Sequence, residues 1–96
     1  MKAVNMVSKS LTSAQIRAAR ALIRWSAEDL SRATALSVTT IRRAELTEKE
    51  TSMTAANELA VRRALEAAGV EFIEENGNGG PGVRLRKRHR PKAGKA

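Results

Sequence analysis

The side chains that could carry catalysis or bind a metal are few in this chain of 96 residues, and they are not clustered. There is no cysteine, which excludes a disulfide framework, a thiolate zinc site and a thiol nucleophile. His89 is the single histidine and lies in a run of arginines, away from any pair of carboxylates. No residue pair is set up for acid–base, nucleophilic or metal chemistry. We therefore expect a protein that is not an enzyme and that needs no metal and no cofactor.

The remaining chemistry is that of positive charge, which is unevenly distributed along the chain. The formal net charge is +8, from 18 Lys and Arg against 10 Asp and Glu. Residues 1–43 carry eight basic and two acidic side chains, and residues 44–83 carry three basic and eight acidic ones. Residues 84–96 carry seven basic side chains and no acidic one. Two basic regions flank an acidic one, which indicates one face that meets an anion and another that meets a different partner.

The composition limits the architecture that positions these charges. The length suits one small domain, and Trp25 and Phe72 are the only aromatic residues, whereas 17 residues are alanine. This predicts closely packed helices with a core of small side chains. No apolar stretch approaches the roughly 20 residues of a membrane helix, and the N-terminus lacks the apolar segment of a secretory signal. We expect a cytoplasmic protein without membrane contact.

Three short helices are predicted in the first half of the chain, over residues 14–23, 27–33 and 38–45. Each is preceded by a serine that can cap it, namely Ser13, Ser26 and Ser37. Helices this short are stable only when they pack against one another. Two short helices joined by a tight turn and preceded by a third form a helix-turn-helix.

The second half predicts a longer helix over residues 55–68, capped by Thr54 and stopped by Gly69. Two strands over residues 70–74 and 83–86 follow, joined by a Gly-rich turn. We therefore divide the chain into an N-terminal arm (1–12), a helix-turn-helix domain (13–69), a β-hairpin (70–86) and a disordered basic tail (87–96). An isolated hairpin is marginally stable and leaves unpaired edges. We expect it to be a dimerisation element that pairs with a second subunit or with a partner protein.

The stretch from Arg20 to Glu45 resembles the Xre/Cro-cI-type helix-turn-helix transcriptional regulators, of the small single-domain bacterial or phage type. The matching positions are Arg20, Leu30, Ser37, Thr40, Ile41 and Glu45. Two residues typical of the family are absent: Ala27 stands where the family has a Gln in the first helix of the motif, and Ala35 stands where it has the Gly of the turn. The resemblance implies a mainly α fold, a lambda-repressor-like domain of four to five helices, here with a C-terminal β-hairpin. It further implies a sequence-specific, nucleoid-associated regulator that binds operator DNA as a homodimer through the major groove.

In such regulators the second helix of the motif lies in the major groove, with residues near its N-terminus facing base edges. By position, the resemblance implies base contacts by Val38, Thr39 and Arg43, with Ser37, Thr40 and Arg42 beside them. It implies a phosphate contact at the helix N-terminus that begins at Ser26, and a structural ion pair between Arg20 and Glu45. Plainer alternatives stay open: Val38 as a core residue, and the threonines as β-branched residues tolerated on a short helix.

Two other functions compete with DNA-binding regulation. A protein-interaction module with the same fold, such as an antitoxin or an antiactivator, would use the acidic segment and the hairpin to hold a partner protein. A small basic RNA-associated protein is supported by the tail but not by the interior of the chain.

Overall fold

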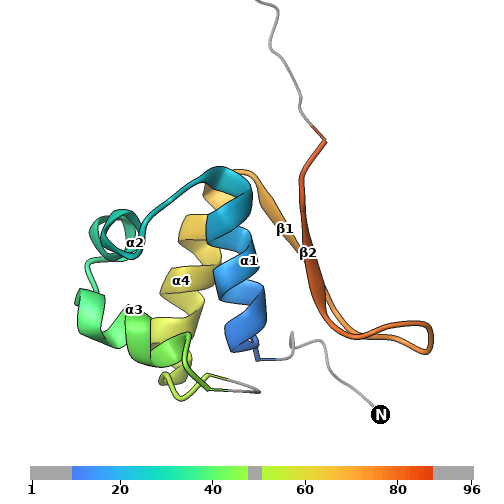
Figure 1. Cartoon of the computed structure of the whole chain (residues 1–96), viewed down its shortest axis with the longest axis horizontal. Helices are drawn as coiled ribbons and strands as arrows, with labels where there is room; N and C mark the ends of the chain where they lie inside the picture. Colours follow the sequence, from blue (N-terminus) through green and yellow to red (C-terminus); the bar gives the residue numbers. More distant parts are fainter. Residues whose placement is uncertain (1–9, 48–50, 88–96) are drawn as a thin grey trace, which may run out of the picture.

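The computed structural model describes residues 10–47 and 51–87 (Figure 1). Its elements are α1 (Ser13–Ile23), α2 (Ala27–Thr34), α3 (Val38–Ala44), α4 (Ala55–Ala67), β1 (Val70–Ile73) and β2 (Gly82–Leu85). The prediction of a mainly helical chain with a hairpin near its C-terminus is confirmed, with element bounds that differ by one residue. Most of the predicted arm (1–9) and of the predicted tail (88–96) lies outside the described residues, as do residues 48–50.

Hydroxyl side chains cap the helices. The predicted caps of α2, α3 and α4 are confirmed, since each accepts a hydrogen bond from the N–H three residues ahead: Ser26, Ser37 and Thr54. The prediction that Ser13 caps α1 is wrong. Thr12 is the cap, and it exchanges two hydrogen bonds with Gln15 in a capping box. Ser13 is instead fully buried, and its hydroxyl donates to the carbonyl of Ala44, which ties the start of α1 to the end of α3.

The core lies where α1 and α4 meet the other elements. Its most deeply buried large side chains are Leu11, Ile16, Leu30, Ile41, Val61, Leu65 and Val70. Ile16 comes from α1, and Val61 and Leu65 come from α4. Burying each such side chain contributes about 1.5–3 kcal/mol, which is what holds helices of seven to thirteen residues together.

Leu11 belongs to this core, although the sequence places it in the N-terminal arm. It is 1% exposed, and its backbone is held on both sides. Its N–H donates to Glu58 Oε2 of α4 at 2.8 Å, and its carbonyl accepts from the N–H of Thr51 at 3.2 Å. The folded unit therefore includes Leu11, earlier than the predicted boundary at residue 13.

The hairpin packs against α1 and α4, on the side of the molecule away from α3 (Figure 1). Its register pairs Val70 with Leu85 and Phe72 with Val83, so these four apolar residues share one face of the hairpin. The buried amide of Gln15 donates to the carbonyls of Ile73 and Gly82, at 3.3 and 3.0 Å. The hairpin is thus anchored to the helices within the single chain, and its pairing with a second subunit stays a prediction. No helix in residues 10–47 and 51–87 is long and apolar enough to cross a membrane.

Candidate nucleic-acid interface

The helices α2 and α3 are joined by a turn of three residues, 35–37, and pack on each other. Ala35, at the position where the resemblance expects glycine, adopts a left-handed conformation with φ 64° and ψ 16°. Its N–H donates to the carbonyl of Ser31 at 2.8 Å, and the Ser31 hydroxyl donates to the carbonyl of Leu36. The turn is therefore tight without glycine, at a cost of about 1–2 kcal/mol for placing a Cβ in this region.

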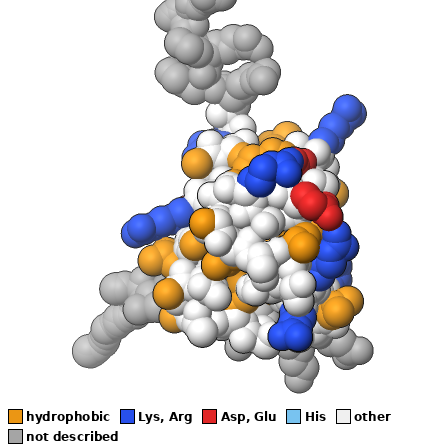
Figure 2. Space-filling view, turned by 90° about the vertical axis from the view of Figure 1, so that its left-hand side faces the viewer, with side chains coloured by type: hydrophobic (Ala, Val, Ile, Leu, Met, Phe, Trp, Pro, Cys, Tyr) orange, Lys and Arg blue, Asp and Glu red, His pale blue; other side chains and the backbone are white. Residues whose placement is uncertain are grey.

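The outer face of α3 carries Thr39 and Arg43, both exposed. They are four residues apart, so their side chains lie one above the other on one side of the helix. The opposite side is buried through Ile41 and Ala44. Two of the predicted base-contacting residues therefore share the solvent-exposed side of α3. Figure 2 shows the side of the molecule formed by α2 and α3, where basic side chains lie around the edge and acidic ones gather on one side.

Val38 differs from this pair. It is half-buried and packs against the core, so the structure favours its plainer interpretation as a packing residue. Ser37 and Thr40 are engaged in the cap, because Ser37 Oγ accepts from the Thr40 N–H at 3.1 Å and lies 3.0 Å from Thr40 Oγ1. Ser37 and Thr40 therefore set the start of α3, and Thr39 is the exposed residue within its first turn, residues 38–40.

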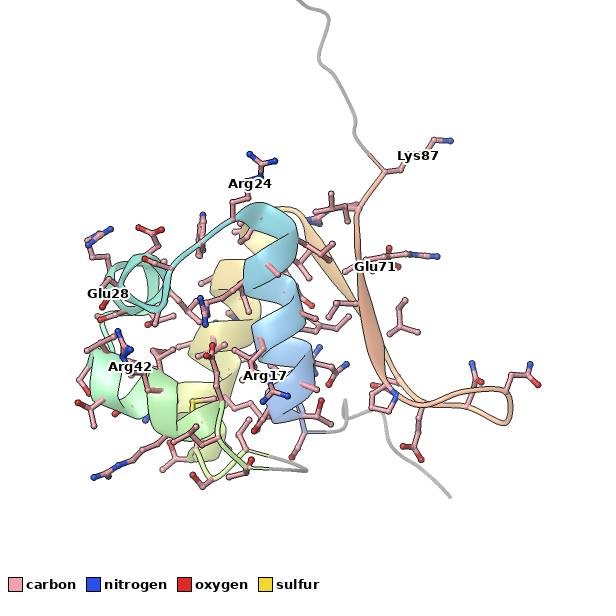
Figure 3. The ribbon with its side chains drawn as sticks, in the orientation of Figure 1. Arg17, Arg24, Glu28, Arg42, Glu71 and Lys87 are labelled. Atoms are coloured by element: carbon pink, nitrogen blue, oxygen red, sulfur yellow. The ribbon has the colours of Figure 1, made fainter. Side chains whose placement is uncertain are left out.

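Arg42 is held by a partner that the sequence did not reveal. Its Nη2 donates to Glu28 Oε2 of α2 at 2.6 Å, and both side chains are half-exposed (Figure 3). The two residues are fourteen positions apart on different helices, so only the tertiary structure brings them together. The pKa of Glu28 lies below its ordinary value, because its own backbone N–H and then Arg42 stabilise the carboxylate.

The N-terminus of α2 is occupied by the protein's own carboxylates. Ser26 Oγ accepts from the Asp29 N–H at 3.0 Å, and Asp29 Oδ2 accepts from the Ser26 N–H at 2.9 Å. The pKa of Asp29 is lowered, chiefly by the backbone N–H and then by the hydroxyl of Ser26. The N–H groups of Ser26 and Asp29 are therefore engaged within the chain, and the carboxylates of Glu28 and Asp29 lie at this helix end. The phosphate contact expected at Ser26 stays a prediction.

The end of α3 is fixed to α1 by a cluster around Glu45. The ion pair expected between Arg20 and Glu45 is present and two-pronged, with N···O distances of 2.7 and 2.8 Å. This hydrogen bonding raises the pKa of Arg20. Arg17 donates to the backbone carbonyl of Glu45 (Figure 3), and Arg20 Nη1 donates to the carbonyl of Trp25 at 2.8 Å. Trp25 is half-buried against the core.

Charge on the α2–α3 surface is nearly balanced. Arg32 pairs with Asp29, and Arg42 pairs with Glu28. In the part of the chain that the structure describes, Arg43 is the arginine of these two helices that has no carboxylate partner. The large positive total of the sequence is therefore not concentrated on this surface, and Arg43 is its available cation.

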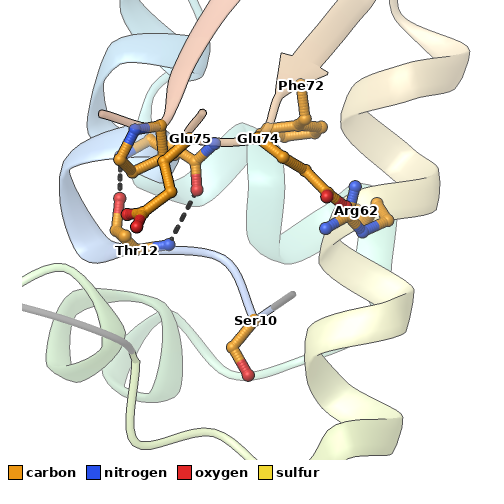
Figure 4. A pocket seen from close by; sticks show the side chains of 8 residues that line it. Ser10, Thr12, Arg62, Phe72, Glu74 and Glu75 are labelled. Atoms are coloured by element: carbon orange, nitrogen blue, oxygen red, sulfur yellow. Dashed lines mark hydrogen bonds between the residues drawn. The ribbon is translucent and has the colours of Figure 1, made fainter. Parts of the chain in front are cut away.

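A separate pocket of about 180 Å³ lies between the start of α1, α4 and the hairpin (Figure 4). Its lining is polar and mixed in charge: Ser10, Thr12, Gln15, Arg62, Phe72, Glu74, Glu75 and Pro81. The Arg62 guanidinium lies 5.2 Å from the centroid of the Phe72 ring, a cation–π contact that joins α4 to β1. No lining residue belongs to α2 or α3, so this pocket is distinct from the candidate interface.

No protein-family model matches the chain, and the search of curated proteins found no match. In the described ranges, no group of three or more His, Cys, Asp and Glu could hold a metal ion.

Proposed function

We propose that the protein binds double-stranded DNA sequence-specifically, with α3 in the major groove, and regulates transcription as a dimer. The observation that carries this proposal is the outer face of α3, where Thr39 and the unpaired Arg43 lie together in solvent. A guanidinium can donate twice to the O6 and N7 atoms of guanine, and a threonine methyl can contact that of thymine. One such bidentate contact discriminates between bases by about 1–3 kcal/mol.

The way in which α3 is held supports this proposal. A reading helix must present its side chains in a fixed orientation, because every group ordered on binding weakens the complex. Ser13, Arg17 and Arg20 of α1 all contact the end of α3, at Ala44 and Glu45. The helix is thus a preorganised platform rather than a segment that must fold on DNA.

The small size of the interface supports a dimer. One helix of seven residues covers a single half-site, and two-fold pairing places two such helices about 34 Å apart on the same side of the duplex. Leu85 at the end of β2 is 52% exposed and is a candidate contact between subunits. Sedimentation velocity at micromolar concentration tests this, and a monomer at every concentration would refute the dimer.

Mobility-shift titration against genomic fragments tests DNA binding itself. The wild-type protein should retain a preferred fragment above physiological salt, whereas a merely basic protein loses affinity for all fragments alike. Arg43→Ala should reduce the preference, and Arg63→Ala, an exposed arginine on α4, is the control with the same change of charge. Equal losses from both variants would contradict the assignment of α3 as the reading helix.

The protein-interaction function has one observation in its favour. Leu46, two residues beyond the end of α3, is 79% exposed. Two of the three arginines on α2 and α3 are paired with carboxylates. A surface with an exposed leucine and little net charge suits a protein partner. A wild-type protein that binds no fragment even at low salt would favour this second function, as an antitoxin-like or antiactivator-like module.

A further inference from the structure

We propose that Glu28 determines specificity by repulsion: it withholds Arg42 from DNA phosphates and so lowers the affinity for arbitrary sequence more than that for the preferred site. This inference rests on the proposed function, because it assigns a role within the same α2–α3 surface. It concerns a residue that makes no favourable contact with DNA.

The geometry provides the first step. Glu28 Oε2 lies 2.6 Å from Arg42 Nη2, and the two side chains are 54% and 55% exposed. An exposed pair of this kind contributes little to stability, so its charges are available to act on a ligand. Arg42 can approach a phosphate either with the Glu28 carboxylate still beside it, where it repels the polyanion, or after leaving Glu28, which then stands unpaired beside the polyanion.

The surroundings strengthen this effect. Asp29 is the next residue, and its carboxylate is fixed by Ser26 and Arg32 at the same end of α2. The other cations near Glu28 are engaged elsewhere: Arg32 of α2 pairs with Asp29, and Arg20 of α1, which interacts with the charge of Glu28, pairs with Glu45. A phosphate that approached this end of α2 would meet two carboxylates, which is unfavourable at every DNA sequence.

The consequence differs between the two modes of binding. Non-specific complexes depend almost entirely on phosphate contacts, so they lose most when Arg42 is neutralised. In the specific complex, we expect base contacts by Thr39 and Arg43 to seat α3, and the side-chain partner of Glu28 is Arg42 rather than either of these two residues. The ratio of specific to non-specific affinity therefore rises, which is the quantity that matters among many competing sites.

The test compares Glu28→Gln with Glu71→Gln in the full chain. Glu71 is the matched control, since it forms the same kind of exposed ion pair, with Arg84 at 3.0 Å, on the hairpin instead of on α2. At about 50 mM salt, Glu28→Gln should bind a random-sequence duplex roughly three to ten times more tightly than Glu71→Gln, with a salt slope steeper by about 0.9, equivalent to one phosphate contact. The preferred duplex should gain less, and Glu28→Gln/Arg42→Gln should lose the gain.

Two results would overturn the inference: equal affinities of the two single variants, or a gain that persists in the double variant. If the wild-type protein bound no duplex, the proposed function would fail, and elution from immobilised heparin would decide the charge effect separately. Elution of Glu28→Gln at higher salt than Glu71→Gln would support the withholding of Arg42 from polyanions, and equal elution would refute it.

Discussion

Arg20 and Glu45, twenty-five positions apart, meet side by side in a two-pronged ion pair, with Nε and Nη2 of the guanidinium at 2.7 and 2.8 Å from the two carboxylate oxygens. Glu45 is 8% exposed at its side chain, and its backbone carbonyl also accepts from Arg17. The pair fixes the C-terminal end of α3 to α1. The orientation of the candidate reading helix therefore depends on residues outside that helix.

Removal of one partner should destabilise the fold. Glu45→Ala leaves the Arg20 guanidinium partly buried without its carboxylate, and we expect the free energy of unfolding to fall by about 2–4 kcal/mol. Urea unfolding followed by circular dichroism measures this. Glu71→Gln, which breaks an exposed pair, is the control and should leave the midpoint nearly unchanged. Similar midpoints for the two variants would show that the Arg20–Glu45 pair does not hold α3.

The turn between α2 and α3 should accept glycine with a gain. Ala35 has φ 64°, a conformation that glycine adopts without the steric cost of a Cβ. The stability gained in this way is partly offset by the greater conformational freedom of glycine in the unfolded chain. Ala35→Gly should therefore stabilise the protein by about 0.5–1 kcal/mol. Ala33→Gly, at an exposed position inside α2, should instead cost about 1 kcal/mol. The two thermal midpoints should move in opposite directions, and a loss in both would refute the left-handed turn.

The hairpin should loosen when Gln15 is replaced. Gln15→Leu removes the amide that donates to Ile73 and Gly82 and the oxygen that accepts from Thr12. Unpaired buried carbonyls cost about 1–3 kcal/mol. Hydrogen exchange should therefore accelerate in β1 and β2 more than in α2 and α3. Uniform acceleration throughout the chain would mean that Gln15 supports the whole core rather than the hairpin.

Stability should fall on the acid side and be flat around neutrality. The pKa values of Asp29 and Glu71 are lowered, by the backbone N–H of Ser26 and by Arg84 respectively. A carboxyl whose pKa is lower in the folded state adds stability above its unfolded pKa, and this is lost as the pH falls through the folded value. The urea midpoint should be constant from about pH 6 to 8 and decrease below about pH 4.5. A midpoint that rises on acidification would contradict these pairings.

The local elements were predictable because their signals are local. Ser26, Ser37 and Thr54 are hydroxyl caps at the start of apolar repeats, and each begins the helix that the sequence predicts. The error at α1 arose because Thr12 and Ser13 are adjacent hydroxyl residues, and only the Gln15 side chain, which completes a capping box with Thr12, distinguishes them. That Thr–x–x–Gln spacing was the signal in the sequence that would have identified the cap.

The site was only partly predictable, because two of its contacts depend on how α2 and α3 cross. Arg42 is a plausible DNA contact by its type and position, and its pairing with Glu28 requires the tertiary structure. From the sequence, Val38 could be either a groove contact or a core residue, because the choice depends on how α3 is rotated about its axis. In the structure, that rotation places Val38 against the core. Arg20 and Glu45 were paired through the family resemblance, since no helical spacing relates them.

Selection of bound duplexes from a randomised library, followed by sequencing, tests the central claim most directly. At salt above the physiological value, the wild-type protein should enrich a motif of two related half-sites with centres about 10 base pairs, or a multiple of this, apart. Arg43→Ala should relax one or two positions in each half-site and leave the spacing unchanged. If the duplexes selected by the wild-type protein had the same base composition at every position as the starting library, sequence-specific recognition by α3 would be contradicted.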